Sequence, residues 1–321
     1  MNPTITEPED SLVEAVLRTL LYADVFGFAM TQAEIHHFLI GLRASSQEVA
    51  AVLQESAYLA QRIQSSNGYY ALQDNAVIAQ RETRNVASVA LWPAARRWGR
   101  ILAHLPFIRM VAITGALAMY NSKPSDDIDY LLVTVPGHTW TARAFSVLLV
   151  RLARFWHIVL CPNYVLAESA LLQNKQNLFI AHELAQMVPL AGLPLYKKLR
   201  TENEWSLPLM PNTGEPFYHV ADFAPYGIGK MLQRLAEFIL TGPLGDRLEH
   251  WEQQRKMRKF EAQAHKDGSA AQLDGQRIKG HFNDYGDPAL EQYRQRLIRY
   301  GLAANLEYRM IPIEESQTVS V

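Results

Sequence analysis

Residues 111–135 place the strongest constraint on how this chain of 321 residues folds. An apolar run ends in the small residues Gly115 and Ala116, a polar loop follows, and a second apolar run opens with Asp127 and Asp129 around one apolar residue. Side chains of a strand alternate between its two faces, so both carboxylates point the same way. Neighbouring carboxylates repel each other, and a cation such as Mg²⁺, which prefers oxygen ligands, removes the repulsion. The segment therefore predicts a strand that carries a metal site.

This pattern resembles the nucleotidyltransferase signature of the DNA polymerase β superfamily, which is an apolar residue, Gly, a small residue, a spacer, and Asp-apolar-Asp at the head of a strand. Further segments around it, such as 161–164 and 181–186, resemble a little-characterised bacterial family of nucleotidyltransferase-like proteins over roughly residues 80–215. The resemblance implies an α+β fold with a small mixed sheet flanked by helices. It also implies a site for Mg²⁺ and a nucleoside triphosphate.

The resemblance assigns roles to individual residues. Asp127 and Asp129 would be the catalytic, metal-binding carboxylates, and the backbone N–H groups of Gly115 and Ala116 would bind nucleotide phosphates. The chain departs from the active pattern at Ala116, where active members carry Ser, and in the absence of an obvious third carboxylate. The next expected strand, at 157–166, offers Asn163 or the following Glu168 at the corresponding position.

Composition sets bounds on the class of protein. The formal net charge is −1, which provides no overall attraction to nucleic acid or to an anionic membrane. The single cysteine, Cys161, excludes an internal disulfide and is typical of a reducing cytoplasm. The N-terminus does not resemble a signal peptide, and no apolar run reaches membrane-spanning length. We expect a cytoplasmic protein with no membrane partner.

The N-terminal 75 residues predict a winged-helix-like module. Helical patterns cover 11–24, 32–40 and 45–55, and a hairpin follows with Asn-Gly at its turn. Many winged helices bind DNA through their third helix. Here that helix carries Glu48 and Glu55 and no Lys or Arg. The pattern argues against DNA binding and favours a packing or dimerisation module.

Two further regions follow this module. Residues 76–215 form the expected nucleotidyltransferase-like domain, and residues 216–321 form a helical C-terminal region with a disordered tail after Ile313. Arg96, Arg97 and Arg100 on a long helix at 75–103 lie either on a solvated face or near nucleotide phosphates. The N-terminal or C-terminal helices could also form an oligomer.

A helix expected at 176–188 places His182 and Glu183 side by side. These residues either make a polar interaction within the fold or belong to the site.

Three hypotheses for function remain open at this point. The first is Mg²⁺-dependent transfer of a nucleotidyl group from a nucleoside triphosphate to a hydroxyl of a small molecule or protein. The second is a catalytically degenerate nucleotidyltransferase scaffold that binds a nucleotide or a protein partner. The third is a DNA-binding regulator, against which the acidic third helix argues. Fold alone does not decide among them.

Overall fold

The computed structural model describes residues 11–72, 75–218, 222–264, 272–273, 275–279 and 285–303. The predicted disordered tail after Ile313 lies outside these residues. The described chain is an α+β structure with two sheets, as the sequence predicts at this coarse level. Within the described residues, no helix combines the length and the apolar character that crossing a membrane requires.

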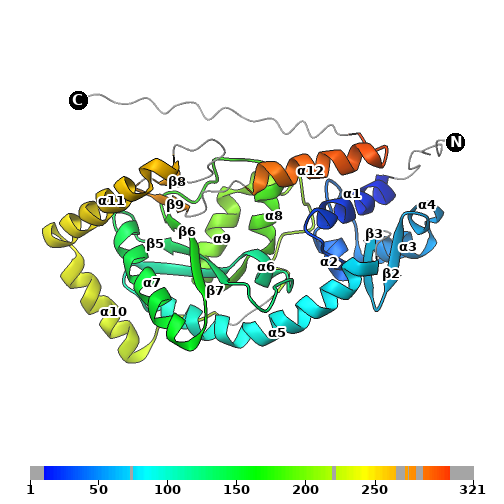
Figure 1. Cartoon of the computed structure of the whole chain (residues 1–321). Helices are drawn as coiled ribbons and strands as arrows, with labels where there is room; N and C mark the ends of the chain where they lie inside the picture. Colours follow the sequence, from blue (N-terminus) through cyan, green and yellow to red (C-terminus); the bar gives the residue numbers. More distant parts are fainter. Residues whose placement is uncertain are drawn as a thin grey trace, which may run out of the picture.

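The N-terminal part contains helices around a small antiparallel sheet of order β1-β3-β2 (Figure 1). Its elements are α1 (Ser11–Val25), β1 (Met30–Thr31), α2 (Gln32–His37), α3 (Ser46–Glu55), α4 (Ala57–Ala60), β2 (Ile63–Ser66) and β3 (Tyr69–Leu72). Capping boxes begin α2 at Thr31 and α3 at Ser45. Asn67 and Gly68 both have positive φ, 52° and 79°, in the turn between β2 and β3. The three predicted helices and the hairpin are present. The second helix ends at His37 and not at residue 40, and a short helix that the sequence did not predict, α4, precedes the hairpin.

The larger sheet has the order β7-β4-β5-β6-β9-β8, with β5 and β6 parallel and the other pairs antiparallel. Its strands are β4 (Ile108–Ile113), β5 (Ile128–Thr134), β6 (Leu160–Ala167), β7 (Val188–Ala191), β8 (Gln272–Leu273) and β9 (Arg277–Lys279). The β5–β6 register shifts after Tyr130, which pairs with Pro162, whereas Leu131 pairs with Tyr164. Asn163 is therefore the extra residue of a bulge in β6.

Helices flank this mixed sheet on both faces. The helices and 3₁₀ turns of this part of the chain are α5 (Asn75–Ala103), α6 (Gly115–Ala118), α7 (Thr139–Ala153), η1 (Arg154–Trp156), α8 (Leu178–Gln186), α9 (Leu193–Glu202), η2 (Glu204–Ser206), α10 (Gly227–Leu240), α11 (Pro243–Ala264) and α12 (Gly286–Arg299). Side chains of β4 and β5 alternate between two apolar clusters. Trp98 of α5 and Trp140 of α7 belong to one cluster, and Leu184 of α8 and Tyr196 of α9 belong to the other.

A third apolar cluster joins the N-terminal helices to later parts of the chain. It contains Leu17 and Phe38 from the N-terminal part, Leu178 of α8, and Tyr293 and Leu297 of α12. In Figure 1, α12 correspondingly lies beside α1 and α8. The boundaries at 75 and 215 stay predictions, but the described core crosses both of them.

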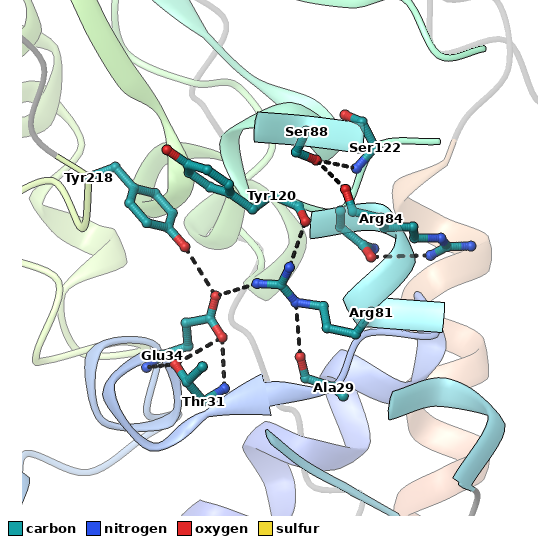
Figure 2. A network of polar contacts seen from close by, with 10 residues as sticks. Ala29, Thr31, Glu34, Arg81, Arg84, Ser88, Tyr120, Ser122 and Tyr218 are labelled. Carbon is teal, nitrogen blue, oxygen red and sulfur yellow. Dashed lines mark hydrogen bonds and ion pairs between the residues drawn. The ribbon is translucent and has the colours of Figure 1, made fainter. Parts of the chain in front are cut away.

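A buried polar network makes the same connection (Figure 2). The guanidinium of Arg81 on α5 pairs with the carboxylate of Glu34 on α2 at 2.9 Å, and both side chains are almost fully buried. Arg81 also donates to the carbonyls of Ala29 and Tyr120, at 3.2 and 2.6 Å. The hydroxyl of Tyr218 donates to Glu34 at 3.2 Å. The N-terminal part is thereby fixed to the segment that precedes the aspartates.

Candidate functional site

Asp127 and Asp129 lie together at the start of β5. Asp129 pairs with Cys161 on the neighbouring parallel strand. One carboxylate oxygen from each aspartate and Sγ of Cys161 all lie within 4.8 Å of one another, and all three residues are half-buried. The two carboxylates thus share one location, as the strand alternation predicts. Their role as metal ligands stays a prediction.

Gly115 lies directly against this pair. It has φ +65°, and a Cβ built on it would be 2.6 Å from Oδ2 of Asp129. That separation is too short for any side chain, and the backbone conformation also favours glycine. Ala116 follows in α6, whose first N–H groups have no acceptor within the helix. Both residues line the same cavity as the aspartates, so the structure brings the predicted turn and the predicted carboxylates together.

The next strand contributes Asn163 and not Glu168. The bulge in β6 directs the side chain of Asn163 to the aspartates, and its Nδ2 donates to Oδ1 of Asp129 at 3.1 Å. Glu168 follows the far end of β6, where its carboxylate lies 3.5 Å from Nζ of Lys198 on the surface. Of the two alternatives from the sequence, only the neutral amide reaches the site.

A third carboxylate reaches the cavity from a helix, at Glu183 of α8. Nε2 of Gln186 donates to it at 2.5 Å. Burial raises the pKa of Glu183 to about 7, and the charge of Lys279 and the bond from Gln186 only partly oppose this shift. The sequence left Glu183 either a polar interaction within the fold or a place in the site, and the structure places it in the cavity lining. The third carboxylate itself was expected on a strand and not on this helix.

The two aspartates of the pair repel each other. Burial, and next the charge of Asp127, raise the pKa of Asp129 to about 7, and Glu183 and Asp126 add to the shift. Burial also raises the pKa of the Cys161 thiol, which is hydrogen-bonded to both aspartates. The thiol therefore remains protonated and acts as a donor to the carboxylates. An arriving cation would meet oxygen ligands rather than a thiolate.

The cavity has a volume of about 800 Å³ and extends from the aspartates to the N-terminal part of the chain. One wall is apolar and comes from α1 and the segment that follows it, through Tyr22, Ala23, Phe26, Phe28 and Met30. The hydroxyl of Thr114, next to Gly115, is buried in the lining and has no hydrogen-bond partner among the described residues. It is an unused donor beside Ala116.

The cations that line the cavity come from three separate segments: Arg84, Lys123 and Lys279. Among the three arginines considered near the phosphates, Arg96 lies over the ring of Trp92 and Arg100 lies over the ring of Phe223. Neither these two nor Arg97 belongs to the described lining. The positive charge expected near a nucleotide thus comes from earlier and later positions than the sequence suggested.

His182 also lines the cavity but is built into the apolar core. Its ring stacks on Tyr22 and Phe38, with centroid distances of 4.3 and 5.5 Å. Burial, and next the nearby His37, lower the pKa of His182 to about 3, so the ring is neutral at physiological pH. Of the adjacent pair, Glu183 faces the polar end of the cavity and His182 joins α8 to the N-terminal helices.

Comparison with protein-family models, with curated proteins and with solved structures finds no match for this chain. The assignment of a metal therefore rests on the donors themselves. Two carboxylates share one half-buried location and a third lies nearby. Burial raises the pKa of Asp129 and of Glu183, and the charge of Asp127 adds to the shift of Asp129. This oxygen-rich set fits Mg²⁺.

Proposed function

We propose that this protein binds a nucleoside triphosphate with Mg²⁺ and transfers its nucleotidyl group to a hydroxyl of a small molecule or protein. The observation that carries the proposal is the contact between Gly115 and the Asp127–Asp129 pair at the polar end of a large cavity. Glycine permits a phosphate to approach the backbone at the point where the carboxylates converge.

Each group in the lining has a task under this proposal. The carboxylates of Asp127 and Asp129 hold the cation, and Asn163 orients Asp129 through its hydrogen bond. The N–H groups at Gly115 and Ala116, with the hydroxyl of Thr114, bind phosphate oxygens. When bound, Mg²⁺ supplies charge stabilisation to the phosphate oxygens of the nucleotide. Arg84, Lys123 and Lys279 add positive charge around the cavity.

Glu183 is the residue suited to accept the proton of the acceptor hydroxyl. A base whose pKa lies near neutrality is efficient at neutral pH, and that of Glu183 is about 7. The acceptor oxygen would form a bond to the α-phosphorus as the bond from that phosphorus to the bridging oxygen breaks. Pyrophosphate leaves with the bond electrons, and the proton passes to Glu183.

A second candidate is a nucleotide-binding protein without turnover. Two observations favour it: Ala116 supplies no hydroxyl, and the strand next to the aspartates supplies Asn163 instead of a carboxylate. Under this alternative the chain binds a nucleotide with Mg²⁺ and uses the bound state to control a partner. The two candidates share the binding site and differ only in the transfer step.

The test has two stages. Calorimetry with ATP, GTP, CTP and UTP, each with Mg²⁺ and with EDTA, measures binding; labelled nucleotides with cell extract then measure transfer. Metal-dependent binding followed by labelling of an acceptor supports the enzyme, and binding without labelling supports the alternative. Absence of binding to all four nucleotides in Mg²⁺ would contradict both. The control is Glu168→Gln, whose side chain lies outside the cavity lining.

A further inference from the structure

Helix α10 is attached to the protein by its polar side. The amide of Gln233 is buried and donates to the carbonyls of Ala103 and Leu105, at 3.2 and 2.9 Å. One turn later, the carboxylate of Glu237 accepts two bonds from the guanidinium of Arg109, at 2.7 and 2.9 Å. Polar contacts of this kind fix the helix, and they leave its apolar side turned away from the protein.

That apolar side is exposed along the whole helix. Its members, here called the α10 stripe, are Ile228 (73% exposed), Met231 (61%), Leu232 (56%), Leu235 (53%), Phe238 (81%) and Ile239 (60%). Figure 1 shows α10 at the edge of the molecule, at the opposite end from the N-terminal helices. A surface helix normally turns such a stripe towards the core. In α10 the usual orientation is reversed.

The spacing within the stripe is that of a helix-pairing seam. Ile228, Met231, Leu235 and Phe238 follow the alternating steps of three and four residues that place side chains at the a and d positions of paired helices. Leu232 and Ile239 widen the seam on one side. The pattern thus points to another helix as the covering element.

We propose that the α10 stripe is the interface through which two copies of this chain form a two-fold dimer, with the two α10 helices antiparallel. An isologous interface requires a surface complementary to itself, and the stripe meets this requirement. With the two-fold axis near Gln233, Ile228 of one copy faces Phe238 of the other, and Met231 faces Leu235. All four seam residues then find an apolar partner at once.

The exposed area agrees with a dimer. Six large side chains that are more than half exposed present on the order of 600 Å² per copy, close to the ~800 Å² that each partner buries in a standard interface. Leu244 and Trp251 of the following helix, α11, are also exposed, 73% and 58% respectively. The stripe therefore has the size that a stable contact between two copies needs.

The charges distinguish a second copy from a lipid surface. Helices that lie on anionic membranes carry a strongly charged polar face rich in Lys and Arg. In α10 the exposed cations, Lys230 and Arg234, lie along one side only, and the other side closes on the protein, where Gly229 packs against His104. In the antiparallel dimer the two Arg234 side chains meet at the solvated rim, so added salt should strengthen the association slightly.

Sedimentation equilibrium of the full chain tests the proposal. We expect wild type to be dimeric at micromolar concentration and Leu235→Glu to weaken the dimer at least tenfold, because two carboxylates would enter the seam. The matched control is Val86→Glu, which adds the same charge at an exposed apolar position of α5 (70% exposed) and should leave the dimer unchanged. Both variants should keep the circular dichroism spectrum and melting profile of a folded chain.

Cross-linking tests the register. In a Cys161→Ser background, a mixture of Ile228→Cys and Phe238→Cys chains should form a disulfide-linked pair under mild oxidation, and Ile228→Cys alone should not. Efficient self-linking of Ile228→Cys would exclude the antiparallel pairing.

A wild-type monomer at all concentrations would overturn the proposal. So would a dimer that Leu235→Glu leaves intact, or a monomer that binds vesicles containing phosphatidylserine and is released by salt. Nucleotide binding at the aspartates enters none of these measurements, so failure of the proposed function leaves the test of the dimer unaffected.

Discussion

Two of the groups of buried charge among the described residues differ in how their charges are balanced. In the network of Figure 2, Arg81 and Glu34 neutralise each other, and backbone and hydroxyl groups bond to both. In the cavity, Asp127, Asp129 and Glu183 carry charge of one sign that Lys279 offsets only in part, and burial raises the pKa of the last two to about 7.

The difference separates charge that serves the fold from charge that requires a ligand. A buried ion pair with all its hydrogen bonds in place needs no ligand to balance its charge. Removing one partner of such a pair destabilises the fold. A group of like charges destabilises the folded chain until a cation binds. Removing these charges by substitution should therefore weaken ligand binding without weakening the fold. Opposite responses to the removal of charge would establish this contrast.

The largest effect on stability is expected in the balanced network. Glu34→Gln removes the charge that balances Arg81, which is 2% exposed, and should lower the free energy of unfolding by about 3–5 kcal/mol. Urea unfolding followed by circular dichroism measures this change. The matched control is Glu291→Gln, since Glu291 pairs with Arg294 on the surface at 2.9 Å and should contribute little. Equal effects at the two positions would contradict the structural role of the network.

The cavity should respond in the opposite direction. Replacing Asp127 and Asp129 together with Asn should weaken Mg²⁺-dependent nucleotide binding by more than the ~100-fold that loss of a residue behind a metal ligand costs. The apo protein should be as stable as wild type or more stable, because the repulsion disappears. Calorimetry and thermal unfolding without metal measure the two effects. Unchanged nucleotide affinity would show that these carboxylates are not ligands.

The pH dependence of the free energy of unfolding should show the destabilising effect of the cavity carboxylates directly. A carboxyl whose pKa is raised in the folded state costs nothing below its ordinary pKa and exerts its full destabilising effect above the raised value. For Asp129 and Glu183, the apo protein should therefore lose stability between about pH 4 and pH 7.

Glu183→Gln should reduce that loss, so the variant should melt above wild type at pH 8 and close to wild type at pH 4. Melting temperatures of the two chains across this range, without metal, provide the measurement. A difference that stays constant with pH would mean that Glu183 does not titrate as described.

The smallest effect is expected from restoring a hydroxyl beside Gly115. Ala116→Ser adds one hydrogen bond to a phosphate, worth about 1 kcal/mol or roughly fivefold in affinity. Asn163→Asp in the same chain should increase transfer, because it adds a carboxylate next to Asp129. Calorimetry and labelled-nucleotide transfer compare the single and double variants. No change in either would place the nucleotide elsewhere in the cavity.

Local patterns allowed the N-terminal part to be predicted well. Thr31 with Glu34 and Ser45 with Glu48 are short-range capping signals, and the structure forms both capping boxes. The shared orientation of the Asp127 and Asp129 carboxylates could be predicted equally well, because the alternation of side chains in a strand depends only on residues adjacent in the sequence. Such features need no knowledge of distant contacts.

Features that depend on contacts between distant parts of the chain could not be predicted from the sequence. Strand β7 is an apolar run of four residues that contains Pro189, and β9 has three residues that pair with β6 from more than a hundred positions away. The bulge at Asn163 depends on the register between two strands, and the role of Glu183 depends on where α8 packs. Neither property is encoded in the spacing of nearby residues.

The contact between Gly115 and Asp129 also has a consequence for related sequences. Because a methyl group at position 115 would overlap the carboxylate of Asp129, the two positions cannot vary independently. Relatives that retain Asp at position 129 should retain Gly at 115, and those that lose the carboxylate are free to acquire a side chain there. This covariation would separate, from sequence alone, the members of a family that keep the site from those that have abandoned it.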